Sequence, residues 1–315
     1  MTARPLPDLP ASLATALAAR YTIERALARG SFAVIYLAHD DKYDRRVVVK
    51  VLLAELASVA QAGRFLREIE IAAKLTHPRI VPLYDSGTAD GFPFYVMPYI
   101  DGPSLRERLE AGPRLEIAEA LRIAGDVAKA LDFAHQHGVV HRDIKPENIL
   151  LAGDEALVAD FGIARAIEVA TGDKLTQTGM TVGTPGYMSP EQVYGRRDLD
   201  GRADVYSLGC VLYEMLANHP PFVAGSVQEV LARHVLDPVP AIRAARPDVP
   251  VAVERAVLKA LAKKPGDRFA TAAHFDAALT GQPAAAAPVP GYGAVGALWS
   301  TLRRTLQRVR RPSSD

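Results

Sequence analysis

An aspartate, a lysine and an asparagine lie close together in one stretch of this chain, His141-Arg-Asp-Ile-Lys-Pro-Glu-Asn148. A second aspartate follows in Asp160-Phe-Gly162. Transfer of a phosphoryl group from ATP to a hydroxyl needs a carboxylate that orients the hydroxyl, a cation near the phosphate and oxygen ligands for magnesium. The residue types and their spacing therefore indicate ATP-dependent phosphoryl transfer.

These two stretches resemble the catalytic and metal-binding loops of protein kinases, and further motifs match that family in order over about residues 21–279. The segments Ser207-Leu-Gly-Cys-Val-Leu-Tyr213 and Leu261-Ala-Lys-Lys264 are most similar to its bacterial, eukaryotic-like Ser/Thr branch. The resemblance implies an α+β bilobal kinase fold. Its N-lobe would be rich in strands with one key helix, and its C-lobe would be mainly helical.

The resemblance assigns catalytic and metal-binding roles to matching residues. Asp143 would orient or deprotonate the substrate hydroxyl, and Lys145 would stabilise the transferring phosphate. Asn148 and Asp160 would ligate Mg²⁺, or alternatively Mn²⁺, because Mg²⁺ prefers oxygen ligands.

Nucleotide binding is assigned to the first third of the chain. Lys50, in Val47-Val-Val-Lys-Val51, would hold the α- and β-phosphates from a strand position that faces the cleft, and Glu68 would pair with it. Met97 would lie at the back of the adenine pocket. Because Pro98 has no N–H, Tyr99 or Ile100 would donate the hydrogen bond to the base.

The glycine-rich loop departs from the family pattern. The loop residues assigned to ATP binding are Leu27, Ala28, Gly30, Ala33 and Ile35. Alanine replaces two of the three glycines, and an alanine held in left-handed geometry costs on the order of 1–2 kcal/mol. The departure predicts weakened or altered nucleotide binding, and it supports an alternative hypothesis, a pseudokinase or scaffold.

An activation segment is expected between Asp160 and Glu191. Arg142, next to Asp143, is typical of kinases that are switched on by phosphorylation of this segment, and Thr176 and Thr178 are the expected sites. Thr184 resembles the threonine that hydrogen-bonds near the catalytic Asp and Lys in Ser/Thr kinases, and together with Lys145 it favours a Ser/Thr acceptor. Three further residues are expected to be structural: Asp204 would brace the catalytic loop, and Glu191 would pair with Arg268.

The apolar periodicity predicts where the elements lie. Strands are expected over 21–25, 33–39, 46–52 and 94–97, and helices over 62–75, 117–137, 203–217, 226–236, 251–262 and 272–279. The predicted organisation is an N-terminal lead-in (1–20), a kinase domain (21–280, with lobes 21–98 and 99–280), a Pro/Ala/Gly linker (281–291) and a basic amphipathic segment (292–315).

Composition limits the partners and the location. The 37 basic and 36 acidic residues nearly cancel, so nucleic acid is not an expected partner. One cysteine excludes an intramolecular disulfide and fits a reducing compartment, so a cytoplasmic location is expected. The basic segment 292–315 suits an anionic membrane surface or a partner protein, and packing on the kinase itself is the alternative. Protein substrates and a homodimer for trans-autophosphorylation complete the expected partners.

Overall fold

The computed structural model describes residues 11–30, 33–52, 59–171 and 184–281. All of them lie in one compact unit, residues 1–283. The linker from residue 282, the basic segment 292–315 and the expected phosphosites Thr176 and Thr178 lie outside the described residues.

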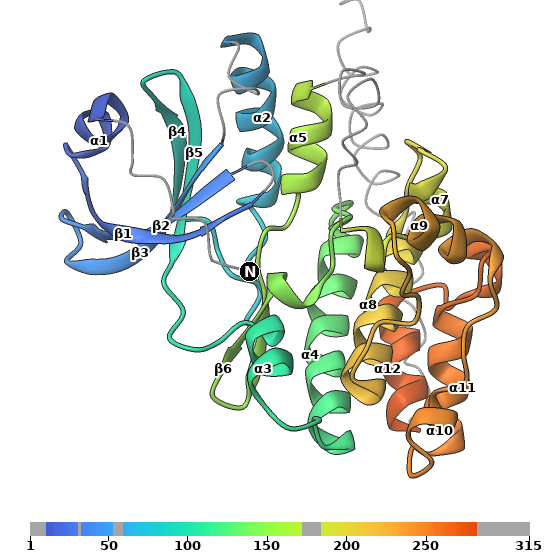
Figure 1. The fold of residues 1–315 in the computed structure, drawn as a ribbon. Coiled ribbons are helices and arrows are strands. Elements are labelled where there is room, and N and C mark those ends of the chain that lie inside the picture. The colour runs from blue at the N-terminus through green and yellow to red at the C-terminus, as the bar shows by residue number, and fades with distance from the viewer. Residues whose placement is uncertain (1–10, 31–32, 53–58, 172–183, 282–315) are drawn as a thin grey trace, which may run out of the picture. The chain divides into compact units, whose positions relative to one another are not determined.

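The N-lobe is built on a five-stranded antiparallel sheet in the order β1-β2-β3-β5-β4 (Figure 1). Its strands are β1 (Tyr21–Arg29), β2 (Ala33–Asp40), β3 (Arg45–Leu52), β4 (Asp85–Ala89) and β5 (Phe92–Pro98). Successive strand residues point to opposite faces. In β3, Val47, Val49 and Val51 belong to one apolar cluster, while Val48 and Lys50 lie on the other face, toward the second lobe.

The segment expected only to lead into the domain contains helix α1 (Ala11–Leu17). Leu13 and Leu17 are buried in the apolar cluster on the outer face of the sheet, together with Tyr21. The helix thus covers a sheet face that would otherwise expose a row of valines.

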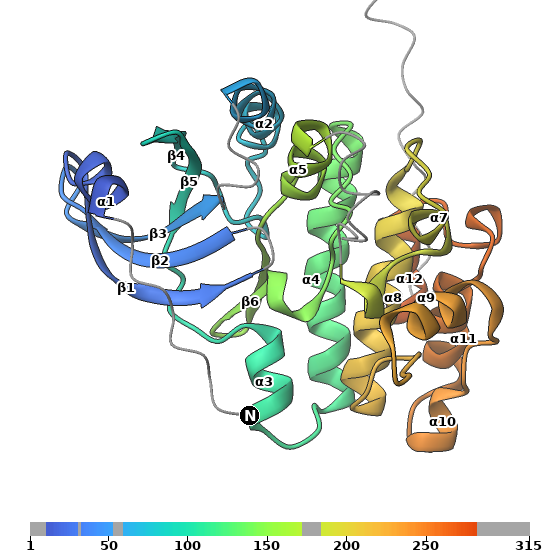
Figure 2. The ribbon, with the colours of Figure 1, turned by 45° about the horizontal axis from the view of Figure 1, so that its top comes forward.

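Two helices lie side by side next to the sheet, as both views show (Figures 1 and 2). One is the expected N-lobe helix, α2 (Val59–Ala72). The other, α5 (Ile163–Thr171), follows Asp160-Phe-Gly162 and was not expected from the sequence. Gly162 has φ of +72°, and a side chain there would lie 3.0 Å from the Cβ of Ala72, so the start of α5 approaches α2 closely.

The C-lobe is helical, with a small two-stranded sheet beside the catalytic loop. Its elements are α3 (Leu105–Ala111), α4 (Ile117–Gln136), β6 (Ile149–Ala152), β7 (Glu155–Val158), α7 (Pro190–Val193), α8 (Gly201–Ala217), α9 (Val227–Leu236), α10 (Ile242–Ala245), α11 (Val251–Ala260) and α12 (Ala272–Thr280), with single 3-10 turns at Pro146–Asn148, Pro185–Tyr187 and Pro265–Asp267. Helix α8 is buried along nearly its whole length and forms the centre of this lobe with α4. In the described part of the chain, no helix is long and apolar enough to span a bilayer.

Candidate active site

The catalytic loop brings together the three residues that the sequence singled out in it. Lys145 Nζ lies 2.6 Å from Oδ2 of Asp143, and Asn148 donates from Nδ2 to the Asp143 carbonyl at 2.8 Å. The backbone N–H of Thr184 reaches Oδ1 of Asp143 at 3.3 Å. The contact expected of Thr184 is therefore made by its backbone. It brings the end of the activation segment to the catalytic carboxylate.

A fully buried carboxylate holds this loop from below. Asp204, in the first turn of α8, accepts hydrogen bonds from the backbone N–H groups of His141 and Arg142, both at 2.8 Å. His135 of α4, which was not predicted from the sequence, is a third partner at 2.7 Å. Burial raises the pKa of Asp204, but the hydrogen bond and charge of His135 outweigh it and leave the pKa below its usual value. Asp204 thus fixes the loop as a carboxylate.

Lys50 makes its closest ion pair with Asp160, not with Glu68. Lys50 Nζ lies 2.5 Å from Oδ2 of Asp160, and Tyr95 donates from its hydroxyl to Oδ1 at 2.9 Å. Burial acts to raise the pKa of Asp160, but Lys50 and the Tyr95 hydroxyl outweigh it, so the pKa lies below its usual value. The backbone of Asp160 has φ of +68°, a geometry uncommon outside glycine and frequent at functional sites.

The expected Lys50–Glu68 pair is a wrong prediction for this conformation. Glu68 Oε2 lies 3.0 Å from Nε of Arg165, which α5 carries. The apolar side chains Ile163, Ala166 and Ile167 of α5 pack against Phe65 and Ile69 of α2 in one cluster. Because α5 places Arg165 beside Glu68, the glutamate has a different cationic partner. Apolar residues at helical spacing after Gly162 were the sequence signal for α5.

The residues that the kinase resemblance places around the adenine belong to one apolar cluster, here called the adenine cleft, with side chains from both lobes. Met97 is buried with Val48, Val81 and Ala159, and further apolar residues are partly buried against them. These residues are Leu27, Ile35, Leu83, Tyr99, Ile100, Leu150 and Leu157. The N–H of Tyr99 donates to the Arg46 carbonyl at 3.4 Å, so the N–H of Ile100 is the better donor for a base.

The alanines of the glycine-rich loop are not strained. Ala28 lies in β1, paired with Ile35, and Ala33 begins β2. Neither alanine is among the described residues with positive φ. Gly30 donates its N–H to the Ala33 carbonyl at 2.8 Å, which closes the hairpin. The strain that would have argued for weak nucleotide binding is therefore absent at these two positions.

The activation segment is anchored where it ends. The side chain of Arg268 is fully buried and pairs with both oxygens of Glu191, at 2.6 and 2.8 Å. The pairing expected from the sequence is present, and it ties α7 to the end of the C-lobe.

Arg106 of α3, which was not predicted from the sequence as part of the site, joins three parts of it. Its guanidinium reaches Glu147 of the catalytic loop at 3.1 Å, Glu214 of α8 at 2.9 Å and the hydroxyl of Tyr187. Tyr187 in turn donates to Glu214 at 2.5 Å. Burial, and then Glu214, raise the pKa of Tyr187, which keeps the hydroxyl protonated as a donor.

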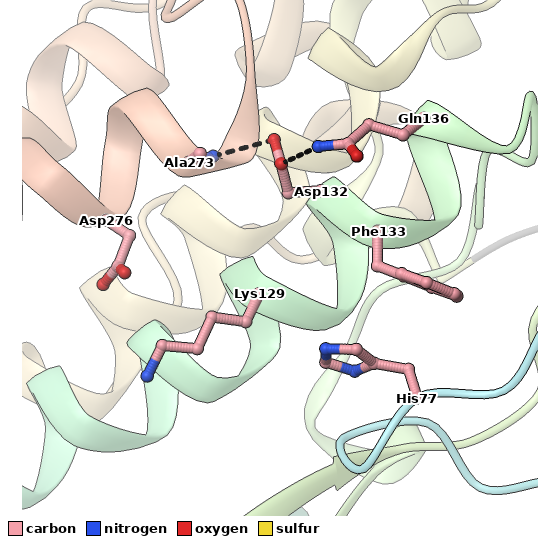
Figure 3. A pocket seen from close by; sticks show the side chains of 7 residues that line it. All are labelled: His77, Lys129, Asp132, Phe133, Gln136, Ala273 and Asp276. Atoms are coloured by element: carbon pink, nitrogen blue, oxygen red, sulfur yellow. Dashed lines mark hydrogen bonds between the residues drawn. The ribbon is translucent and has the colours of Figure 1, made fainter. Parts of the chain in front are cut away.

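A separate pocket lies between α4, α12 and the loop after α2. The ring of His77 stacks on Phe133, and Asp132 accepts hydrogen bonds from the Ala273 N–H and from Gln136 (Figure 3). Lys129 and Asp276 complete its lining. None of the residues assigned a catalytic or binding role lines it, so we assign it no part in phosphoryl transfer.

The oxygen atoms that Asp160 and Asn148 offer as ligands fit a magnesium–nucleotide complex. Asp160 supplies a carboxylate that is still 15% exposed, and the hydrogen bonds of Asn148 to Asp143 use Nδ2, so its Oδ1 is the atom suited to a cation. In the part of the chain that the structure describes, no group of three or more His, Cys, Asp or Glu side chains is placed so that it could hold a metal ion by itself. Mg²⁺ is commonly held by one or two protein ligands, with phosphates and water completing its shell.

Comparison with known proteins gives a consistent picture. The protein kinase domain family matches residues 21–274. Serine/threonine-protein kinase PknB of Mycolicibacterium smegmatis is 45% identical over 270 residues, which cover 84% of this chain and 43% of that protein. Serine/threonine-protein kinase PknD of Mycobacterium tuberculosis is 44% identical over 255 residues, which cover 80% of this chain and 38% of that protein.

A solved structure has the same fold. The crystal structure of Rad53 1-466 in complex with AMP-PNP matches with a TM-score of 0.68 at 22% identity, and the match covers 82% of this chain and 64% of that one. At this identity the likeness shows the fold alone. The chain spans less than half the length of the curated relatives described above.

Proposed function

Because the chain belongs to the protein kinase family, in its bacterial eukaryotic-like serine/threonine branch, we propose that it transfers the γ-phosphate of ATP to serine and threonine hydroxyls of proteins. The observation that carries this proposal is the catalytic loop. Asp143 is held beside Lys145, Asn148 and the N–H of Thr184, and Asp204 fixes the backbone below them. A carboxylate in this position orients an acceptor hydroxyl, and the adjacent ammonium stabilises phosphate charge.

ATP would lie between the two lobes. The adenine would contact Met97 and Val48, and the Ile100 N–H would donate to it. Mg²⁺ would be held by Asp160 and Asn148, and it would neutralise phosphate charge during the transfer. Lys50 is within reach of Asp160 and lies on the cleft face of β3, where it would bind the phosphates once they are present.

The described conformation has to rearrange before transfer. In active protein kinases the strand lysine pairs with the helix glutamate, while the metal-binding aspartate holds the cation. Here Lys50 binds Asp160, and Arg165 of α5 binds Glu68. We therefore assign the α2–α5 contact to a resting state, in which the activation segment keeps Glu68 from Lys50.

Replacement of Arg165 by alanine is expected to speed autophosphorylation. Arg165 is 47% exposed, so its ion pair with Glu68 contributes at most about 1 kcal/mol, and its loss favours the Lys50–Glu68 pair by up to about fivefold. The measurement is the initial rate of label incorporation from ATP into dephosphorylated protein. Arg165→Lys keeps the positive charge, so its rate should stay near that of wild type. Arg67→Ala removes an arginine of α2 and should also leave the rate near that of wild type. An unchanged or lower rate for Arg165→Ala would contradict the assignment.

Autophosphorylation of the activation segment is the expected route to the active state. Thr176 and Thr178 follow α5 in the chain, and phosphate there adds charge that Arg142, next to Asp143, is suited to bind. Purified protein with labelled ATP and Mg²⁺ should therefore gain phosphate at these threonines, located by mass spectrometry. The double variant Thr176→Ala/Thr178→Ala should lose that label.

Two alternatives give different results in the same experiment. A scaffold that has kept the fold would label neither itself nor a general protein substrate while remaining folded. A small-molecule kinase would consume ATP without labelling any protein. The unstrained Ala28 and Ala33 remove one argument for the scaffold.

We further propose a cytoplasmic location and self-association for trans-autophosphorylation. The single cysteine, Cys210, is buried, and burial raises its pKa, so it behaves as an apolar core residue.

The arginines of segment 292–315 would attach the chain to an anionic membrane or a partner. Co-sedimentation with vesicles of anionic lipid, compared with a chain ending at residue 291, tests the membrane proposal. Sedimentation velocity at several concentrations tests self-association.

A further inference from the structure

Tyr95 has a contact that the kinase resemblance did not predict. It lies in β5, directly opposite Lys50 of β3 in the antiparallel register, so both side chains occupy the cleft face of the sheet. Tyr95 is 2% exposed, and its ring packs near Phe65 of α2. Its hydroxyl donates to Oδ1 of Asp160 at 2.9 Å, while Lys50 binds Oδ2. The Asp160 carboxylate is thus held at both oxygens.

The two donors differ in what they can do once a nucleotide is bound. Lys50 is a cation, and phosphates or Glu68 compete for it. Tyr95 is uncharged, and its buried hydroxyl donates to Oδ1 at 2.9 Å. A carboxylate oxygen has two lone pairs, so a hydrogen bond to Oδ1 still leaves the carboxylate able to bind a cation. Because Tyr95 carries no charge, its hydrogen bond does not repel a cation at Asp160 as the Lys50 ammonium does.

Partners of this kind are known to control metal affinity. Hydrogen bonds to a ligating carboxylate fix its orientation, and their removal typically weakens metal binding by 10–100-fold. Asp160 is additionally held in left-handed backbone geometry, with φ of +68°. The direction of its carboxylate is therefore set by its backbone at one end and by the Tyr95 hydroxyl at the other.

We infer that Tyr95 is a positioning residue, whose hydroxyl holds the Asp160 carboxylate in the orientation that binds the divalent cation accompanying ATP. The inference rests on the proposed function, in which Asp160 is a metal ligand. It adds to that function a residue on β5 that acts through Asp160 and does not itself touch the cation or the substrate.

The test measures metal binding directly. Mn²⁺ is titrated into the full chain, saturated with a non-hydrolysable ATP analogue, and free Mn²⁺ is followed by electron paramagnetic resonance. Tyr95→Phe keeps the buried ring and removes the hydroxyl, so its Mn²⁺ dissociation constant should rise by about 10–100-fold. Affinity for the analogue in EDTA should change less than twofold, because Tyr95 is not among the side chains of the adenine cleft.

Tyr21→Phe is the matched control. Tyr21 is also buried in the N-lobe, and its hydroxyl also donates to an aspartate, Asp85, at 2.8 Å. It should leave Mn²⁺ affinity unchanged. Tyr95→His retains a ring N–H donor and should lose less Mn²⁺ affinity than Tyr95→Phe.

The outcomes separate this inference from the proposed function. If Asp160→Asn does not weaken Mn²⁺ binding, the proposed metal site is wrong. If Asp160→Asn weakens it but folded Tyr95→Phe binds Mn²⁺ like wild type, the role of Tyr95 is overturned and the metal site stands. Equal losses of Mn²⁺ affinity in Tyr95→Phe and Tyr95→His would assign the effect to packing, and this result would also overturn the role of the Tyr95 hydroxyl. When Asp160→Asn is already present, adding Tyr95→Phe should not weaken Mn²⁺ binding further.

Discussion

Replacement of Asp143 by asparagine is expected to lower the rate of phosphate transfer by about 10³-fold, within the 10²–10⁴-fold range of general acid–base contributions. Asp143 accepts from Lys145 at Oδ2 and from the Thr184 N–H at Oδ1. An asparagine side chain has one acceptor oxygen and one NH₂ group. Its NH₂ group, itself a donor, would therefore face either the Lys145 ammonium or the Thr184 N–H. The variant loses the carboxylate that would receive the hydroxyl proton, and it loses one of these two contacts.

The measurement is kcat for transfer to a protein substrate, together with the dissociation constant for ATP. The ATP affinity should be retained, because Asp143 lies in the catalytic loop and not among the apolar residues of the adenine cleft. Asp132→Asn, in the pocket of α4, is a control that changes the same kind of group elsewhere (Figure 3). A rate within tenfold of wild type would remove Asp143 from the transfer step.

The resemblance to protein kinases was sufficient to predict the residues of the catalytic loop and its supports. The contacts of Asp143 with Lys145 and Asn148 lie within one short segment, so their spacing alone constrains them. Strand alternation placed Lys50 on the cleft face, because neighbouring valines pack on the other side. The family pattern also anticipated how Asp204 and Arg268 are used, although their partners are distant in sequence.

The partner of Lys50 could not be predicted in the same way. Two acidic residues, Glu68 and Asp160, are suited to it, and no sequence spacing decides between them. The choice depends on α5, whose apolar residues bury themselves on α2 and bring Arg165 to Glu68. Tyr95 was missed for a related reason. Its contact with Asp160 depends on the β3–β5 register and on the left-handed backbone of Asp160, and both are tertiary features.

Replacement of Glu191 by glutamine is expected to destabilise the fold by about 3–5 kcal/mol, the usual consequence of leaving one member of a buried ion pair without its partner. The side chain of Arg268 is fully buried and that of Glu191 is 10% exposed. Besides Glu191, the guanidinium donates to three backbone carbonyls, those of Ala262, Arg202 and Lys263. A glutamine preserves the shape but leaves the buried cation without a counter-charge and points an amide N–H₂ at one of its donors.

Thermal unfolding measures this effect. A loss of this size lowers the midpoint by roughly 10 °C, at about 2–4 °C per kcal/mol for a large domain. Asp198→Asn is the control, because Asp198 also pairs with an arginine, Arg196 at 2.9 Å, but is 72% exposed. Its midpoint should stay close to that of wild type, since exposed ion pairs contribute little.

The location of the Glu191–Arg268 pair makes its loss a test of mechanism as well as of stability. Glu191 lies in α7, which follows the stretch 184–187. The first residue of that stretch, Thr184, donates its N–H to Asp143. Helix α7 also contacts the catalytic loop through Gln192, which donates to the Arg142 carbonyl at 2.7 Å. Below the unfolding midpoint, Glu191→Gln should therefore lose transfer rate while it retains ATP affinity. A variant that loses stability but keeps its transfer rate would show that the anchor supports the C-lobe alone.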